Sequence, residues 1–311
     1  MTVQTSGSTG MPKQLIVKKE QMIQSARQTC AFLRLKKKDK ALLCMSLQYI
    51  GAKMMVIRSL IAGLELIVRE PSGHPMADVD MPIDFAAMVP LQIFNSLQVP
   101  EEKERLLQVK KLIIGGGMID PLLEKELKSF PNEVYSTYGM TETLSHIALR
   151  QINGQDASSF YTPFPSVNLT LSIDGTLVVN APLICDEPLV TNDIAEINPD
   201  GSFRILGRKD NVINSGGIKL QIEAIEEKLK PILTRPFAIT FVPDMKLGEA
   251  VVLLIEGIDH MEEIKKLVVD ALPKYEQPRH IYFVETIPIT GNSKIGRKAC
   301  KELAFSIYSG S

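Results

Sequence analysis

The chain has 311 residues, of which 45% are hydrophobic and 23% are charged, and its formal net charge is −1. The composition is ordinary for a globular protein, and the length exceeds what one compact core usually holds, so we expect two domains. A net charge near zero provides no basic surface for nucleic acid and no attraction to a membrane, so we expect neither partner.

Targeting and metal-binding signals are weak. The longest apolar stretch, residues 54–68, is interrupted by Arg58 and Glu65, and a polar loop begins within four residues of Met1. We therefore expect a cytoplasmic location, without a membrane helix or leader. The four cysteines lie far apart and the four histidines form no metal-binding pattern, which argues against a disulfide framework and a protein-ligated zinc site.

A loop rich in hydroxyl groups and glycine occupies residues 5–13. Its backbone N–H groups, its hydroxyls and a flexible lysine can converge on phosphoryl oxygens. It is not a Walker A loop, because Met11 and Pro12 separate Gly10 from Lys13. Taken alone, such a run is more often a linker or an exposed loop. The candidate phosphate-binding residues are Thr5, Ser6, Gly7, Ser8, Thr9, Gly10 and Lys13.

From residue 14 to about 130, short apolar runs alternate with stretches of helical length. The expected strands are 41–45, 64–68, 86–89 and 112–114. This pattern predicts an α/β domain with a mainly parallel sheet. The last strand runs into Gly115, Gly116 and Gly117, where either a flat ring approaches the backbone or the chain makes a tight turn.

The pattern changes twice in the second half of the chain. Between 167 and 206, short alternating strands with turns at Asp174-Gly175 and Asp200-Gly201 predict a small antiparallel β subdomain. After Gly207 an α+β pattern follows. We expect helices at 221–229 and 261–271 and strands at 238–242, 251–256 and 281–284. We place the domains at residues 1–209 and 210–311.

Four motifs follow the first loop in order. They are Tyr138-Gly139-Met140-Thr141-Glu142-Thr143, Thr191-Asn192-Asp193, Gly207-Arg208-Lys209-Asp210 leading to Ser215-Gly216-Gly217, and Pro288 to Arg297 with Lys294. With the loop, they resemble the core motifs of the acyl-adenylate-forming (AMP-binding) enzymes, the superfamily of acyl-CoA synthetases, luciferases and peptide-synthetase adenylation domains. The resemblance implies a larger N-terminal α/β domain and a smaller, mobile α+β C-terminal domain. It also implies that the chain is N-terminally shortened, because family members carry a substantial region before the phosphate loop.

The resemblance assigns the chemistry of adenylation to three residues. Lys294 would bridge the carboxylate and the α-phosphate, Thr141 would hydrogen-bond the α-phosphate, and Glu142 would hold Mg²⁺. A Thr-Glu pair by itself is more often a helix N-cap, an alternative that stays open for Thr143. Tyr138 would stack on adenine, or else pack in the core.

Other motif residues would bind ATP and coenzyme A. Asp193 would accept hydrogen bonds from the ribose hydroxyls with support from Arg208, although an Asn-Asp pair also suits a turn. Gly216 and Gly217 would lie beside the pantetheine arm of coenzyme A, and Asp210 would be the hinge of the mobile domain. The remaining nucleotide-contacting candidates are Gly115, Gly116, Gly117 and Gly139.

The acid substrate is suggested by the apolar segment 51–63 and by the Thr-Glu motif. Both look like the o-succinylbenzoate:CoA ligases of menaquinone biosynthesis, in which an arginine at the position of Arg58 lies by the acyl pocket. An arginine in an apolar helix needs a partner, either a dicarboxylic substrate or a structural acid. Tyr49 stands where many relatives have histidine, and Ser145 could face the acyl group. His146 is more often a packed helix residue.

We therefore expect an AMP-forming acid:CoA ligase that uses ATP, Mg²⁺ and coenzyme A, with o-succinylbenzoate as its preferred small-molecule acid. One alternative is a ligase for another aromatic or fatty acid. Another is a non-catalytic remnant that binds a nucleotide or an acyl group, suggested by the short N-terminal region. The presence of Lys294, Glu142 and Asp193 argues against the remnant, which has no need of an adenylation lysine. The oligomeric state stays open, with a homodimer as one option.

Overall fold

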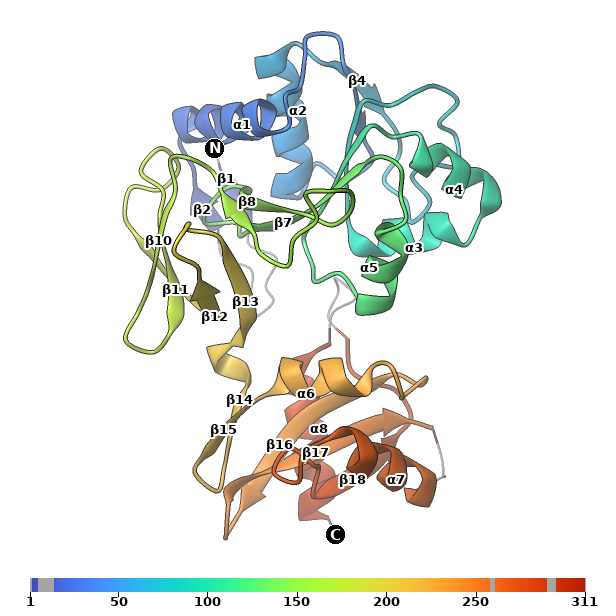
Figure 1. Cartoon of the computed structure of the whole chain (residues 1–311), viewed down its shortest axis with the longest axis vertical. Helices are drawn as coiled ribbons and strands as arrows, with labels where there is room; N and C mark the ends of the chain where they lie inside the picture. Colours follow the sequence, from blue (N-terminus) through green and yellow to red (C-terminus); the bar gives the residue numbers. More distant parts are fainter. Residues whose placement is uncertain (1, 5–13, 258–260, 290–294, 311) are drawn as a thin grey trace. The chain divides into compact units, whose positions relative to one another are not determined.

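The computed structural model describes residues 2–4, 14–257, 261–289 and 295–310 (Figure 1). Contacts between Cα atoms divide the chain into two units. The first comprises Met1–Thr191 and Glu196–Arg204, and the second Asn192–Ala195 and Ile205–Ser311. The predicted domain boundary at 209/210 and the hinge role of Asp210 stay predictions.

A seven-stranded sheet forms the centre of the first unit, with the strand order β4-β3-β5-β6-β7-β8-β9. The strands from β4 to β7 pair in parallel, and β8 and β9 add an antiparallel edge. Their bounds are β3 Lys40–Leu43, β4 Glu65–Val68, β5 Phe85–Met88, β6 Lys111–Ile114, β7 Glu133–Gly139, β8 His146–Gln151 and β9 Thr162–Pro163. The mainly parallel sheet predicted from the short apolar runs is confirmed.

Helices cover both faces of this sheet, because side chains of neighbouring strand residues point to opposite faces. On one face, Leu42, Leu112 and Val134 share a buried cluster with side chains of α3, α4 and α5, each of which begins with a proline suited to the first helical turn. On the other face, Phe32 of α1 packs edge-on against Tyr135. The helices are α1 Lys19–Phe32, α2 Ile50–Ala62, α3 Pro90–Leu97, α4 Pro100–Leu107 and α5 Pro121–Leu127.

Two smaller sheets accompany the large one. Strands β1 (Thr2–Gln4) and β2 (Gln14–Ile16) pair antiparallel. A four-stranded sheet contains β10 Asn168–Leu171, β11 Thr176–Asn180, β12 Leu189–Ile197 and β13 Phe203–Arg208 in that order. Its turns use Gly175 (φ 75°) and Gly201 (φ 84°), backbone angles that glycine adopts without strain. The predicted antiparallel subdomain and its two turns are confirmed.

The second unit is built on a five-stranded sheet with helices on both faces. Alternate residues of β17 explain this, since Val251 and Leu253 pack with α6 and α7, and Val252 and Leu254 pack with α8. The elements are a short 3-10 helix at Lys209–Asn211, β14 Val212–Ser215, β15 Ile218–Gln221, α6 Ile222–Leu229, β16 Phe237–Asp244, β17 Gly248–Glu256, α7 Met261–Ala271, β18 His280–Val284 and α8 Arg297–Ser309. The α+β pattern predicted after Gly207 is confirmed.

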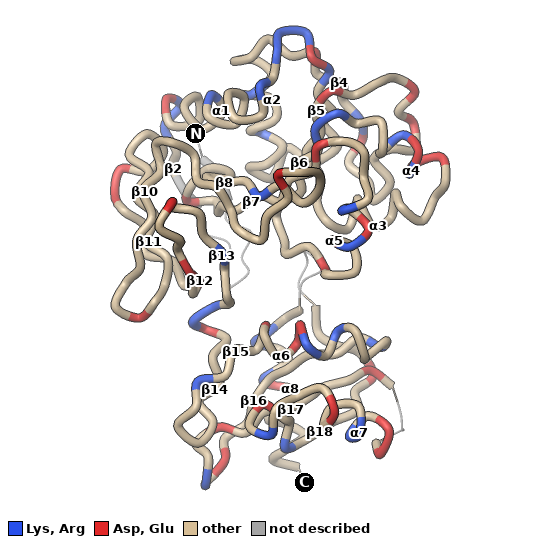
Figure 2. Tube along the Cα trace, viewed as in Figure 1, with Lys and Arg blue, Asp and Glu red and all other residues tan. Residues whose placement is uncertain are grey.

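Charged residues of both signs are interspersed along both units, as Figure 2 shows. Within the described ranges, no helix is long and apolar enough to cross a membrane. The cysteines are free thiols, and all of them are buried; they are Cys30, Cys44, Cys185 and Cys300.

The backbones of β7 and β8 lie very close together at Gly139. The pairing of these strands is irregular between Tyr138 and Gly139. A Cβ atom on Gly139 would lie 2.3 Å from the carbonyl oxygen of Ser145 and 2.5 Å from the Cα of His146. Both neighbours are backbone atoms, so no rotamer change can make room, and only glycine fits.

We expect Gly139→Ala to lower the free energy of unfolding by about 1 to 3 kcal/mol, because the added methyl group forces the two strands apart. Urea unfolding followed by circular dichroism measures the change. Gly51→Ala is the matched control, since a Cβ on this residue of α2 would meet nothing closer than 3.8 Å. It should leave stability unchanged or raise it by up to about 1 kcal/mol. Equal losses in both variants would contradict the steric explanation.

Candidate active site

Two predicted parts of the site lie outside the described residues. The first is the phosphate loop with Thr5, Ser6, Gly7, Ser8, Thr9, Gly10 and Lys13, and the second is the segment that contains Lys294. Their roles stay predictions. The described ends of the second segment are joined, because Ile289 and Ile295 form an antiparallel bridge and the Gly296 N–H donates to the Pro288 carbonyl at 2.7 Å.

Arg58 is a buried cation in α2, with 1% of its surface exposed. Its Nη2 donates to the Ser145 hydroxyl at 2.7 Å, and its Nη1 lies 3.8 Å from the sulfur of Met55. Its Nε is buried without a hydrogen-bond partner. In the described part of the chain, no carboxylate lies within ion-pair distance of this guanidinium. Burial lowers the pKa of Arg58 to about 10, so it remains charged at neutral pH.

The Thr-Glu motif forms a turn between β7 and β8. The Met140 N–H donates to the Thr143 hydroxyl at 2.9 Å, and that hydroxyl donates to the Ser145 carbonyl at 2.7 Å. No helix begins in this fully described turn, so the N-cap alternative for Thr143 is wrong, as is the expectation that His146 is a helix residue, because it opens β8. The buried hydroxyl of Thr143 closes a strand-to-strand turn instead.

The same turn exposes its catalytic candidates. Thr141 is half-buried and Glu142 is exposed, whereas the backbone carbonyl of Glu142 accepts a weak hydrogen bond from the Cys185 thiol at 3.4 Å. Tyr138, also half-buried, packs edge-on against Phe203 with 5.1 Å between ring centres. The geometry therefore leaves the Thr141 and Glu142 side chains accessible to a ligand.

Local packing and backbone conformation explain why glycines follow β6. A Cβ on Gly115 would lie 2.2 Å from the hydroxyl oxygen of Thr137, and Gly116 has φ 80°. These facts favour the tight-turn interpretation for Gly115 and Gly116. Gly117 follows in the same loop. Contact of the three glycines with adenine stays a prediction.

Tyr49 takes no part in the contact between Arg58 and Ser145. It precedes the first residue of α2 and is 53% exposed. Arg58 and Ser145, in contrast, come together from α2 and from the turn before β8, 87 positions apart in sequence. Two of the three predicted substrate residues therefore meet, and the third lies at the start of the helix.

The motif that ends at Asp193 and the motif that ends at Asp210 meet in the second unit. There the Arg208 guanidinium pairs with the carboxylates of both aspartates. Its Nη1 lies 3.1 Å from Asp193 Oδ1, and its Nη2 lies 3.1 Å from Asp210 Oδ2. The side-chain amide of Asn192 also donates to Asp210 at 3.1 Å. Such a planar cation fixes the orientation of both acids. Sequence reasoning predicted Asp193 and Arg208 at the ribose and Asp210 at the hinge, but it missed the ion pairs that join these three residues.

Gly216 and Gly217 form the turn between β14 and β15, with φ 60° and 83°. A two-residue hairpin with positive φ at both positions is the turn type that glycine favours. The Gly216 N–H donates to the Leu247 carbonyl at 2.8 Å, which ties this turn to the segment before β17. The glycines therefore have a structural role as well as the predicted ligand contact.

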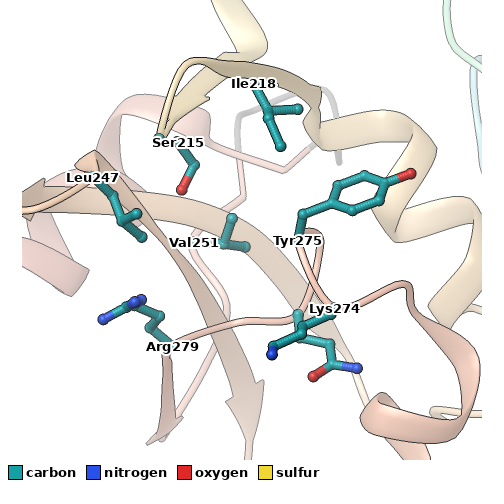
Figure 3. A pocket seen from close by; sticks show the side chains of 9 residues that line it. Ser215, Ile218, Leu247, Val251, Lys274, Tyr275 and Arg279 are labelled. Carbon is teal, nitrogen blue, oxygen red and sulfur yellow. The ribbon is translucent and has the colours of Figure 1, made fainter.

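A cleft of about 240 Å³ opens beside this turn, between Ser215, Leu247, Tyr275, Lys274 and Arg279 (Figure 3). It carries two cations and an aromatic ring. Sequence reasoning missed the cleft, because its walls come from the β14–β15 hairpin, the segment before β17 and the segment before β18, and no single motif joins them.

Comparison with known proteins gives both a family and relatives. Residues 3–177 match the AMP-binding enzyme family. The chain is 27% identical over 210 residues to the 2-succinylbenzoate-CoA ligase of Lactococcus lactis, an alignment that covers 62% of this chain and 47% of that protein. It is 25% identical over 317 residues to the ligase of the same name from Salmonella typhimurium, with 96% and 67% covered. The chain thus spans about half the length of the first relative.

Solved structures share the fold. An acyl-CoA synthetase (AMP-forming)/AMP-acid ligase II-like protein from Dyadobacter fermentans superposes with a TM-score of 0.66 at 34% identity, covering 96% of this chain and 88% of that one. The o-succinylbenzoate CoA synthetase of Bacillus subtilis in complex with the acyl-adenylate OSB-AMP gives a TM-score of 0.80 at 20% identity, with 96% and 68% covered. Because the family matches more than half of the chain and the first of these proteins is matched over most of its length, this chain belongs to the AMP-binding enzymes.

Proposed function

We propose that this chain activates o-succinylbenzoate with ATP to an acyl-adenylate and transfers the acyl group to coenzyme A, the ligase step of menaquinone biosynthesis. The observation that carries the choice of acid is the buried, anion-free Arg58 of α2. A buried cation without a counter-charge is costly, and a bound carboxylate removes that cost. Relatives of this chain are 2-succinylbenzoate-CoA ligases by name, which supports the same acid.

A dicarboxylic acid suits this site better than a monocarboxylic one. One carboxylate of the acid must react with ATP, so only a second carboxylate is free to pair with Arg58. The unpartnered Nε and the weakly held Nη1 are the hydrogen-bond donors that such a group would use. The structural-acid alternative lacks support, because no described carboxylate reaches Arg58. An aromatic or fatty acid with a single carboxylate would leave the guanidinium unpaired.

Adenylation in this proposal depends on Lys294, Thr141 and Glu142, together with the phosphate loop. Within the described residues, no group of three His, Cys, Asp or Glu side chains is arranged to hold a metal ion. The exposed carboxylate of Glu142 fits Mg²⁺ bound with ATP, because such an ion typically uses one or two carboxylates together with substrate phosphates. Glu142, exposed on its turn, would hold the ion, and Mg²⁺ would neutralise phosphate charge. Thr141 would donate a hydrogen bond to the α-phosphate, and Asp193, oriented by Arg208, would accept hydrogen bonds from the ribose.

The cleft beside Gly216 supports coenzyme A as the acyl acceptor. Lys274 and Arg279 place two positive charges at its wall, and Tyr275 offers a ring for stacking. Coenzyme A carries both phosphates and an adenine, the groups that cations and aromatic rings bind. We propose that residues 210–311 act as the mobile domain with its hinge at Asp210, and that the enzyme works in the cytoplasm.

The first test concerns Arg58. We expect Arg58→Met, which keeps the apolar volume but removes the charge, to raise the KM for o-succinylbenzoate by about 30-fold or more, since leaving a buried carboxylate unpaired costs about 2 to 5 kcal/mol. The KM for ATP and activity on monocarboxylic acids of similar shape should change little. Arg69→Ala, which removes a half-buried arginine that bonds backbone carbonyls away from Ser145, is the control. An equal loss on mono- and dicarboxylic acids would make Arg58 structural.

The second test separates the two half-reactions. We expect Lys294→Ala to lower ATP-pyrophosphate exchange by about 100-fold or more, because the lysine would stabilise charge only during adenylation. Thioester formation from supplied acyl-adenylate and coenzyme A should remain near the wild-type rate. Lys298→Ala, an exposed lysine of α8, should leave both rates unchanged. Equal loss of both half-reactions in a folded Lys294→Ala enzyme would refute the role.

The third test concerns the cleft. Lys274→Ala should raise the KM for coenzyme A by about tenfold, the worth of one hydrogen bond to a charged phosphate, and leave pyrophosphate exchange intact. Lys265→Ala on α7, an exposed lysine paired with Glu262, is the matched control. If both lysine variants gave the same KM for coenzyme A, the cleft would not be the binding site.

A further inference from the structure

A continuous chain of hydrogen bonds links α1 to Arg58 inside the first unit. The Thr29 hydroxyl donates to the Ser25 carbonyl at 3.2 Å and lies 2.9 Å from Nε2 of His146. Nδ1 of His146 lies 3.3 Å from the Ser145 hydroxyl, which accepts from Arg58 Nη2 at 2.7 Å. Thr29 and His146 are buried, so water cannot replace these partners.

The donor and the acceptor of each hydrogen bond in this series can be assigned. A hydroxyl has a single proton, and Thr29 uses it on a carbonyl, so Nε2 of His146 must donate to Thr29. Burial and the nearby Arg58 charge lower the pKa of His146 well below its ordinary value, so the ring is neutral and its Nδ1 is an acceptor. Ser145 then donates to Nδ1 and turns its lone pairs toward Arg58.

These donor and acceptor assignments determine which hydrogen bonds the Ser145 hydroxyl can form. Its proton is held by His146, so its oxygen is available only as an acceptor for Arg58. The His146 ring is itself fixed, because it packs edge-on against Phe164 with 5.7 Å between ring centres. Together these contacts hold one edge of the guanidinium in place, and they leave Nε without a protein partner.

We propose that Thr29 and His146 are positioning residues that orient Arg58, through Ser145, for the free carboxylate of the acid substrate. Neither residue is expected to touch the substrate. This inference rests on the proposed function, since it gives the oriented guanidinium a dicarboxylic ligand.

The experiment removes the hydroxyl of Thr29 or that of Ser25 from α1 and measures the KM for the acid. Thr29→Val keeps the shape of the side chain but breaks the chain at its first link, and we expect the KM for o-succinylbenzoate to rise about fivefold to tenfold. The kcat and the KM for ATP should stay near the wild-type values. Thr29→Ser restores the hydroxyl and should restore the KM. Ser25→Ala is the matched control, because the Ser25 hydroxyl is equally buried on the same helix but has no partner.

A second variant tests the same inference independently, in case Thr29→Val does not fold. His146→Phe keeps a ring against Phe164 and removes both of its hydrogen bonds, so it should raise the same KM. The inference is overturned if folded Thr29→Val and His146→Phe bind the acid as the wild type does. It is also overturned if Ser25→Ala raises the KM as much as Thr29→Val, or if Thr29→Ser fails to restore it.

A measurement without substrate separates this inference from the proposed function. Nitrogen-15 NMR should show His146 as the neutral tautomer with its proton on Nε2, and the Arg58 guanidinium with separate Nη signals in the wild type and in Ser25→Ala. In Thr29→Val the two Nη signals should merge. If wild-type enzyme shows these signals but does not turn over o-succinylbenzoate, the proposed acid is wrong while the orienting chain stands. A proton on Nδ1 would overturn the chain itself.

Discussion

The close backbone contact between the paired strands β7 and β8 at Gly139 is the constraint from which the first part of the site follows. Because two backbones meet there without room for a methyl group, the intervening residues must close in a short turn held by the buried hydroxyl of Thr143. Thr141 and Glu142 remain accessible, and Ser145 turns inward to Arg58. One local constraint therefore places the proposed phosphate-binding and acid-binding groups on the same turn, residues 140–145.

The burial of Arg58 has an energetic consequence. A guanidinium removed from water loses several kcal/mol of hydration, and hydrogen bonds to a serine and a thioether recover only part of it. The lowered pKa of Arg58 has the same origin, since burial disfavours the charged form. Folding of the rest of the unit must offset this cost. A bound carboxylate would return part of it as binding free energy, which makes the acid site selective for a second negative charge.

The sequence could predict much of the fold because its signals were local. Apolar runs gave the parallel strands, and Gly175 and Gly201 gave the hairpin turns. Contacts between distant segments could not be predicted in this way. A helix N-cap stayed open as an alternative for Thr143 because Thr and Glu favour helix N-termini, yet the close strand contact at Gly139 overrides that preference. The cleft near Lys274 and the contact between Thr29 and His146 likewise depend on residues that meet only after the chain has folded.

In the last motif, Pro288 to Arg297, one residue is proposed for catalysis and a near neighbour stabilises the fold. Arg297 opens α8 and makes two hydrogen bonds to Glu226 at 2.6 and 2.7 Å, and Glu226 also accepts from the Ile239 N–H. Glu226 is buried and Arg297 half-buried, and both oxygens of the carboxylate are bonded, so the pair ties α8 to α6 and β16. With the bridge between Ile289 and Ile295, it fixes both ends of the segment that contains Lys294. The motif can therefore combine a residue proposed for catalysis with an anchor whose charge is fully used by the fold.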